Sequence, residues 1–465
     1  MIVPVSVVNK TLEKALSNGA DFAEIFIEDS YSGKLSVLSS KPKVVTVARL
    51  HGAGIRVHYG TEEIYVTTSD LSEKGLLDAA GRAASAISRA EAKLKTVNLF
   101  EEPVQTYDAF QAYGKMPWEI DQAEKLRYLM SLDKQARSKN SLVAQVEPMI
   151  LEKVQRIQIA NSQGVHKTDQ RTNYRIFLDV QVEDAGKTET FMVNRFSTKN
   201  SQFYQELSPD NLVDEALSGV NTLLSADYSP AGEMPVIIDN GFGGVIFHEA
   251  CGHGLETTSV APKASVFTGK LGERVGEACL TAIDDGTVDG GWGSLSIDDE
   301  GNSAQKTVLI ENGILKSYMV DQLGAKKTGY SITGSGRRQS YKFAPTSRMR
   351  NTFIAPGTEK LENMISDLDY GIYAKTMGGG SVSPGTGEFN FSVKEAYLVQ
   401  NGKIVKPVKG ATLIGKGIET LGRITKVADN LKLSAGTCGS VSGMIPAAVG
   451  QPAVLVSKIL VGGRA

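Results

Sequence analysis

The 465-residue sequence predicts an α+β fold in two parts, and three observations support that prediction. Apolar residues recur at helical spacing in several stretches of the first half, between strand-like runs. A Pro230-Ala-Gly232 break follows the clearest helix and places a domain boundary between residues 228 and 229. Glycine totals 48, about a tenth of the chain, which favours tight turns between short strands. We therefore expect an N-terminal mixed α/β domain with a sheet and helices (residues 1–228) and a C-terminal β-rich domain (residues 229–465).

The first elements follow from periodicity and turn signals. Residues 7–17 carry apolar side chains at helical spacing and end at Asn18-Gly19, so they predict a helix. Ser72 is a suitable N-cap for an alanine-rich helix that runs to about residue 88. Between these helices, glycine or charged turns separate four runs that predict short strands: residues 24–28, 44–49, 55–59 and 64–67.

The middle of the chain continues this mixture. Two prolines make residues 95–117 an irregular surface segment, and a helical pattern follows over residues 118–138. Three strand-like runs lie within residues 143–192. Residues 212–224 form the clearest helix, because their leucines, valines and alanines make one apolar stripe. Residues 235–241 then predict a strand and a glycine turn that lead into another helix.

Composition and charge weigh against several classes of protein. Fifty basic and 52 acidic residues give a net charge of −2, which provides no overall attraction for nucleic acid. Three cysteines without a C-x-x-C pair do not indicate a disulfide scaffold and fit a reducing compartment. No apolar run reaches the roughly 18 residues needed to span a bilayer, and the first residues lack a signal-peptide pattern. We expect a cytoplasmic protein that binds neither membrane nor nucleic acid directly.

Two of the five histidines surround a glutamate, as His248, Glu249 and His253, in the helix predicted after the glycine turn. In the zinc-protease pattern H-E-x-x-H, histidines four residues apart share one helix face and the glutamate is the general base. Here the histidines are five residues apart, and five residues of a regular helix turn a side chain by about 140°. The helix must therefore deform if both rings bind one metal, through a π-bulge or through unwinding at Gly252 and Gly254.

A catalytic zinc usually has three protein ligands, so one more must be found. The local candidates are Cys251 and Glu256, and the distant ones are Cys279, Cys438 and other carboxylates. Cys251 lies three residues after His248 but is equally well explained as a small buried thiol. Cys438 lies in a glycine-flanked segment, predicted to be a loop, whose backbone can approach a metal. Spacing alone leaves these alternatives open.

Ordered motifs along nearly the whole chain add a resemblance to a known family. The matching segments are Ala20-Asp-Phe-Ala-Glu-Ile-Phe, Gly54-Ile-Arg-Val, Asp284-Asp-Gly-Thr, Ile297-Asp-Asp-Glu-Gly, Leu309-Ile-Glu-Asn-Gly, Gly336-Arg-Arg, Tyr370-Gly-Ile-Tyr, Gly378-Gly-Gly, residues 406–415 and Thr437-Cys-Gly. With H-E-x-x-x-H at residues 248–253, they make the chain resemble the TldD/PmbA family of metallopeptidases, on the TldD side.

The resemblance implies one Zn²⁺ per active subunit, bound by His248, His253 and Cys438, because Cys438 matches the family's downstream cysteine ligand. It also implies hydrolysis of peptide bonds in unfolded or flexible peptides. In this hypothesis Glu249 takes a proton from metal-bound water during attack on the peptide carbonyl and delivers it to the leaving nitrogen. A thiolate ligand makes the bound water less acidic, which increases the value of such a base.

The resemblance further implies a two-subunit assembly, either a homodimer or a heterodimer with a PmbA-like subunit. The alternative is a catalytically silent peptide-binding or partner subunit, against which the intact ligand set and Glu249 weigh. Arg337 and Arg338 are candidates for substrate contact, because arginine pairs bind carboxylates bidentately. The acidic residues at 284–285 and 298–300 lack the spacing of a calcium loop, so we expect them in solvated turns.

Overall fold

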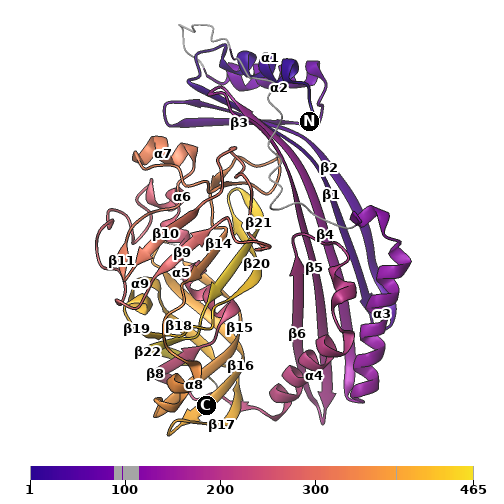
Figure 1. The fold of residues 1–465 in the computed structure, drawn as a ribbon, viewed down its shortest axis with the longest axis vertical. Coiled ribbons are helices and arrows are strands. Elements are labelled where there is room, and N and C mark those ends of the chain that lie inside the picture. The colour runs from indigo at the N-terminus through magenta and orange to yellow at the C-terminus, as the bar shows by residue number, and fades with distance from the viewer. Residues whose placement is uncertain (1, 88–96, 98–114, 384, 464–465) are drawn as a thin grey trace.

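The computed structural model describes residues 2–87, 97, 115–383 and 385–463, and Figure 1 shows them as two lobes side by side. The N-terminal lobe is built on a six-stranded antiparallel sheet in the order β3-β2-β1-β4-β5-β6. Its strands are β1 (Phe22–Leu38), β2 (Lys41–Tyr59), β3 (Glu62–Thr68), β4 (Val143–Asn161), β5 (His166–Asp184) and β6 (Lys187–Ser197). Four of these strands have 17 to 19 residues, so the sheet extends along the length of the other lobe.

Two pairs of helices cover this sheet near its two ends (Figure 1). Helices α1 (Val5–Leu16) and α2 (Glu73–Ser85) pack on β1 and β2, while α3 (Gln122–Lys139) and α4 (Pro209–Ser225) pack on β4 and β5. Ser72 Oγ accepts a hydrogen bond from the Gly75 amide at 3.1 Å, which confirms the predicted N-cap. All four helices occupy stretches where the apolar periodicity predicts them.

The strands of this lobe are longer than predicted. Residues 44–49 and 55–59, expected as separate strands, belong to the single strand β2. Gly54 lies inside this strand. The position needs a glycine because a Cβ there would fall 1.7 Å from Tyr65 Oη and 2.7 Å from Tyr341 O. This glycine therefore allows close packing and makes no turn. The segment predicted as irregular, residues 95–117, lies almost wholly outside the described residues.

The C-terminal lobe is β-rich, as predicted, and contains two main sheets. The six-stranded sheet has the order β11-β10-β9-β14-β21-β20, and the eight-stranded sheet has the order β15-β8-β22-β18-β16-β17-β7 with β19 beside β22. The strands are β7 (Asp227–Tyr228), β8 (Gly232–Ile238), β9 (Ala282–Asp285), β10 (Lys306–Glu311), β11 (Ile314–Leu315), β12 (Gly336–Arg337), β13 (Thr346–Ser347), β14 (Asn351–Ile354), β15 (Tyr370–Ser383), β16 (Glu388–Gln400), β17 (Lys403–Lys409), β18 (Thr412–Lys416), β19 (Ile424–Val427), β20 (Lys432–Ser440), β21 (Gly443–Gln451) and β22 (Val454–Gly462).

Short helices complete this lobe. They are α5 (Val245–Ala250), α6 (Thr257–Val260), α7 (Gln322–Thr328), α8 (Leu361–Ser366) and α9 (Gly417–Leu421). The largest apolar cluster of the molecule draws side chains from both sheets and from α5. The helix that carries the histidine motif is therefore part of the core of the lobe and is held firmly from two sides.

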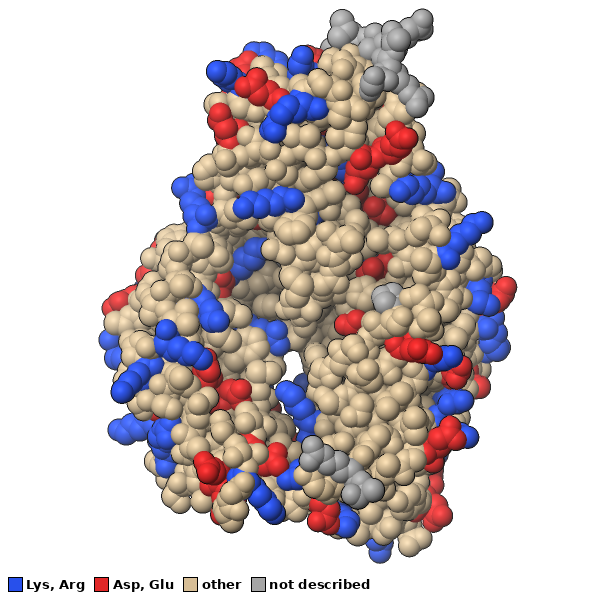
Figure 2. All heavy atoms as spheres, turned by 180° about the vertical axis from the view of Figure 1, so that it is seen from behind, with Lys and Arg blue, Asp and Glu red and all other residues tan. Residues whose placement is uncertain are grey.

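The lobes touch through Phe26, Ile157 and Ile159 on the long sheet, which pack against Ile297 and Tyr341. Figure 2, seen from behind, shows an opening between the lobes with Lys and Arg side chains at its edge. Within the described part of the chain, no helix combines the length and apolar character needed to cross a membrane.

Candidate metal centre

His248 and Glu249 lie near the end of α5, which follows β8 and a 3-10 turn, η4 (Gly241–Gly244). The glycine turn is needed because a Cβ at Gly244 would lie 2.4 Å from Gly450 O on β21. Strand, glycine turn and helix thus follow one another as the sequence predicts. His248 is only 3% exposed, so this arrangement places its imidazole in the interior of the lobe.

The helix does not continue to His253. It ends just before Cys251, whose φ of −125° and ψ of −46° break the helix, and a separate 3-10 turn, η5 (Gly252–Leu255), carries His253. Gly252 lets the chain pass close to Met349 at the break, because a Cβ there would lie 2.2 Å from Met349 Sδ and displace that side chain. The predicted deformation is therefore confirmed, and it takes the form of local unwinding.

Cys438 approaches the histidines from β20, where it faces Ile445 of β21 across the ladder. The segment predicted as a loop is therefore a strand. Its glycines misled the prediction because they provide space and make no turn: Gly436 and Gly439 have no positive φ, and a Cβ at Gly439 would lie 2.9 Å from Met444 Sδ.

Arg348 holds this hairpin in place. Its guanidinium is fully buried and donates to Cys438 O at 2.7 Å, to Gly443 O at 2.9 Å and to Ser442 Oγ at 2.8 Å. One side chain therefore fixes both strands and the turn beside the cysteine. No local sequence signal connects Arg348 with Cys438, and the sequence analysis missed this residue.

The three side chains His248, His253 and Cys438 meet at one point. Cys438 Sγ lies 3.2 Å from His248 Nε2 and 3.4 Å from His253 Nε2, and all three atoms lie within 4.8 Å of one another. A tetrahedral zinc with bonds of about 2.3 Å to sulfur and 2.0–2.1 Å to nitrogen separates its ligand atoms by about 3.3 to 3.6 Å. The donor set and its spacing fit a zinc ion. Among the described residues, no other group of His, Cys and carboxylate side chains meets the same criterion.

The charges of these groups favour the metal-binding form of the cysteine. Burial acts to raise the pKa of Cys438, but the charge of His248 and hydrogen bonds from both imidazoles outweigh it and hold the pKa well below the ordinary thiol value. Burial acts to lower the pKa of His253, but Glu256 and Cys438 outweigh it and raise the pKa well above the usual range. The site therefore stabilises a thiolate, the form of cysteine that binds metals.

Two glutamates surround His253 in different ways. Glu249 Oε2 lies 3.7 Å from His253 Nε2, on the side of the ring that faces Cys438, and the Glu249 side chain is 30% exposed. Glu256 is buried and binds the other ring nitrogen, with its Oε2 at 3.1 Å from His253 Nδ1. Glu256 Oε1 also accepts a hydrogen bond from the Met349 amide at 3.3 Å. Glu249 is partly exposed to solvent, whereas Glu256 is positioned to orient the histidine.

Cys251, the nearer of the two cysteine candidates, does not reach the histidine rings. Its thiol is buried in the apolar core of the lobe, beside Ile246 and Phe247. Burial raises the pKa of Cys251 well above that of an ordinary thiol. The structure thus brings Cys438, and not Cys251, to the two imidazoles.

Arg337 and Arg338 are both buried, but their surroundings differ. Arg338 is paired with Glu24 at 2.6 Å and donates to Asp299 O at 2.7 Å. Arg337 donates one hydrogen bond, to Met349 O at 2.9 Å, and forms no ion pair with a described carboxylate. Their predicted contact with substrate stays a prediction.

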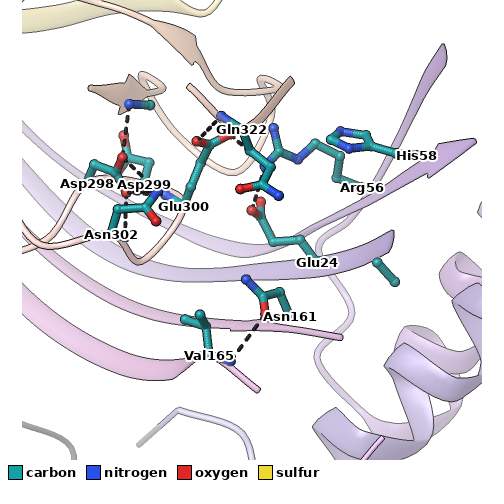
Figure 3. Close-up of polar contacts among 12 residues, drawn as sticks. Glu24, Arg56, His58, Asn161, Val165, Asp298, Asp299, Glu300, Asn302 and Gln322 are labelled. Atoms are coloured by element: carbon teal, nitrogen blue, oxygen red, sulfur yellow. Dashed lines mark hydrogen bonds and ion pairs between the residues drawn. The ribbon is translucent and has the colours of Figure 1, made fainter. Parts of the chain in front are cut away.

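The acidic residues expected in solvated turns are buried instead, which corrects that prediction. Asp284 binds Arg350 at 2.7 Å, and Glu300 binds Arg56 at 2.7 Å. Arg56 also binds Glu24 at 2.7 Å, so this network joins the two lobes, as Figure 3 shows. The neutralising arginines are far away in sequence, and the local acidic pattern gave no sign of them.

Comparison with known proteins identifies the family of the chain. Three family models match the chain in order: PmbA/TldA metallopeptidase domain 1 over residues 23–87, the central domain over residues 115–224 and the C-terminal domain over residues 231–463. The chain belongs to the PmbA/TldD metallopeptidase family. The resemblance seen in the sequence motifs is therefore confirmed.

Relatives of this family cover most of the chain. A metalloprotease TldD homologue of Haemophilus influenzae is 39% identical over 78% of this chain and 76% of its own length. One from Buchnera aphidicola is 34% identical over 97% of this chain and 95% of its own length. A zinc metalloprotease TldD homologue of Saccharolobus solfataricus is 34% identical over 50% of this chain and 52% of its own length.

Solved structures of two proteins share this fold. A Thermotoga maritima protein described as a candidate modulator of DNA gyrase has a TM-score of 0.79 at 20% identity, over 98% of this chain and 99% of its own. TldE from Thermococcus kodakarensis has a TM-score of 0.75 at 18% identity, with the same coverage of both chains. The α+β architecture is therefore that of the family.

Proposed function

We propose that this chain is a zinc-dependent metallopeptidase that hydrolyses peptide bonds of unfolded or flexible peptides. In this proposal His248, His253 and Cys438 bind one Zn²⁺ per active subunit, and Glu249 is the general base. The observation that carries it is the meeting of the three ligand atoms within 4.8 Å of one another, beside an accessible carboxylate. The printed name of the Saccharolobus relative, a zinc metalloprotease, supports the choice of metal.

Each residue has a distinct task in the reaction. Zinc bound by the three ligands would lower the pKa of a coordinated water and polarise the peptide carbonyl. Glu249 accepts a proton from the attacking water on its carboxylate and delivers it to the leaving amine nitrogen. Because a thiolate ligand such as Cys438 reduces the positive charge available to the water, the rate depends strongly on this base. Glu256 keeps the His253 ring in one tautomer and orientation.

We further propose that the active form is a two-subunit assembly in the cytoplasm, either a homodimer or a heterodimer with a PmbA-like subunit. The likeness to the fold of a protein named TldE supports a pairing of two family members. A catalytically silent peptide-binding subunit is the alternative. The ligand cluster and Glu249 favour the active form, because a silent subunit has no need of an accessible base beside a metal site.

Metal analysis combined with a cleavage assay tests this proposal. Purified protein should contain about one zinc per chain, as expected for three ligands and an open fourth position, and should cleave casein or a flexible peptide. A chelator should abolish cleavage and added zinc should restore it. Glu249→Gln should retain zinc and lose about 100-fold or more of the rate, the value of one general base. Wild-type activity in this variant would refute the role of Glu249.

A further inference from the structure

A cleft lined by both charged and apolar side chains lies between the long sheet and the C-terminal lobe, apart from the metal ligands. Its enclosed part has a volume of about 40 Å³, enough for a small group such as a carboxylate, and it opens to solvent. Strands β4 and β5 form one wall, and Trp292, Arg337 and Met444 belong to the other. Figure 2 shows Lys and Arg side chains where the lobes are separated.

The charged side chains that line this cleft are of two kinds. Arg171 is neutralised by Asp169 at 3.1 Å and by Asp299. Arg338 is neutralised by Glu24 at 2.6 Å. In these pairs the arginine charges are neutralised by carboxylates of the protein, so neither arginine is available to an anionic ligand.

Lys153 and Arg337 are different, since neither forms an ion pair with a described carboxylate. Lys153 Nζ makes one long hydrogen bond, to Gln339 O at 3.4 Å. Arg337 is 4% exposed, its Nε has no partner among the described residues, and its hydrogen bond to Met349 O uses only Nη1. The nearby carboxylate of Glu28 is already occupied by Gln155 Nε2 at 2.9 Å and the Tyr341 amide at 2.7 Å.

A third cation lies beside Trp292, which lines the cleft. Arg175 on β5 lies 5.8 Å from the Trp292 ring centroid and donates to Ala435 O on β20 at 2.9 Å, but it binds no described carboxylate. Burial lowers the pKa of Lys153, and it lowers the pKa of Arg175 and of Arg337 to about 10. A cation that is partly withdrawn from water and has no carboxylate partner is costly, and an anionic ligand beside Arg337 and Lys153 would reduce this cost.

We propose that Arg337 and Lys153 form a subsite for a carboxylate of the peptide substrate. An arginine fork and a lysine together match a carboxylate with charge-assisted hydrogen bonds. The subsite is linked to the metal centre, because Arg337 donates to Met349 O while the Met349 amide donates to Glu256, the residue that binds His253. A peptide held in the cleft by its carboxylate would therefore be positioned relative to the scissile bond.

This inference rests on the proposed peptidase function but can be tested without turnover. Peptide binding is measured by fluorescence anisotropy with zinc-loaded Glu249→Gln protein and labelled flexible peptides in two matched pairs. The first pair has either a free C-terminal carboxylate or a C-terminal amide. The second pair has an internal Asp or an internal Asn. We expect the acidic member of one pair to bind about 10- to 100-fold more tightly, as for hydrogen bonds to charged groups.

The pair that shows the preference identifies the source of the carboxylate. In the same background, Arg337→Gln and Lys153→Gln should bring the affinity ratio towards one. Lys134→Gln is the matched control. Lys134 is exposed on α3, so this substitution removes one positive charge far from the cleft. Thermal melting checks folding, and the partly buried Lys153 keeps the test valid if Arg337→Gln does not fold.

Two results would overturn the subsite: a ratio of one for both pairs, or a preference that persists in both variants. The proposed function fails separately. If the wild-type protein cleaves no peptide while the binding preference depends on Arg337 and Lys153, the peptidase proposal is wrong and the subsite stands. If cleavage occurs without any carboxylate preference, the peptidase proposal stands and the subsite is wrong.

Discussion

His253 Nδ1 lies 3.1 Å from Glu256 Oε2, so the ring nitrogen that points away from Cys438 is bound by a buried carboxylate. Histidines that bind metals commonly donate the N–H of their second ring nitrogen to a carboxylate. This hydrogen bond fixes the tautomer and increases the basicity of the nitrogen that binds the metal. Glu256 is itself held by the Met349 amide. The orientation of His253 therefore depends on residues that do not bind the metal.

Glu256→Gln should weaken zinc binding by about 10- to 100-fold without changing the ligands, because the neutral amide is a poorer acceptor than the carboxylate. Competition with a chromogenic chelator measures this affinity. Glu273→Gln is the control, since Glu273 is exposed in the same lobe and pairs only with Lys270 on the surface. Equal zinc affinity in wild type and Glu256→Gln would contradict the positioning role.

The two buried cysteines of the C-terminal lobe should respond differently to the same substitution. Cys438→Ser should lose most of the zinc during gel filtration, because a serine hydroxyl is a poor replacement for a thiolate ligand. Cys251→Ser should keep its zinc but lose about 1–3 kcal/mol of stability, because its hydroxyl would be buried among apolar side chains. Elemental analysis and thermal melting separate the two effects. Zinc retained in Cys438→Ser and lost in Cys251→Ser would reverse the assignment.

Local patterns predicted the helices of the N-terminal lobe, the β-rich second half and the deformed histidine helix. They succeeded because periodicity, N-caps such as Ser72 and glycine turns act over a few residues. The division between residues 228 and 229 stays our proposal, supported by the Pro230-Ala-Gly232 break between β7 and β8. The short strand β7, just before the division, already pairs with β17 of the C-terminal sheet. Motif resemblance, and not spacing, chose Cys438 over Cys251.

The errors concern contacts between segments that are distant in sequence. Gly54 looked like a turn because Tyr65 and Tyr341, which fill the space above it, could not be foreseen. Glu300 looked solvated because Arg56, its partner, lies on the other lobe. Arg348 gave no signal at all. Such residues depend on tertiary packing, which a single sequence does not display.

Glu24 links the lobes through two buried guanidiniums, and its removal should be costly. Arg56 and Arg338 bind its two carboxylate oxygens at 2.7 and 2.6 Å, and all three side chains are fully buried. Figure 3 shows Glu24 beside Arg56. Glu24→Gln should destabilise the protein by about 3–5 kcal/mol, because two buried positive charges lose their shared partner.

Denaturant unfolding measures the effect of Glu24→Gln. Glu73→Gln is the matched control, because the Glu73 pair with Lys10 is exposed and should contribute less than about 1 kcal/mol. Similar stabilities of the two variants would show that the network between the lobes does not depend on the charge of Glu24.

Glu300 should make stability fall as the pH rises. Burial raises the pKa of Glu300 to about 8, and neighbouring carboxylates add to this shift while Arg56 opposes it. The folded state therefore binds a proton more tightly than the unfolded state, whose glutamate has a pKa of about 4.3. The resulting stability is fully present below about pH 4.3 and is lost as the pH rises through about 8.

The glutamine of Glu300→Gln does not ionise, so the free energy of unfolding of this variant should decline less between pH 5 and 8 than that of the wild type. Denaturant unfolding at several pH values, with Glu73→Gln as control, measures both slopes, and parallel curves for wild type and Glu300→Gln would show that Glu300 does not titrate in this range.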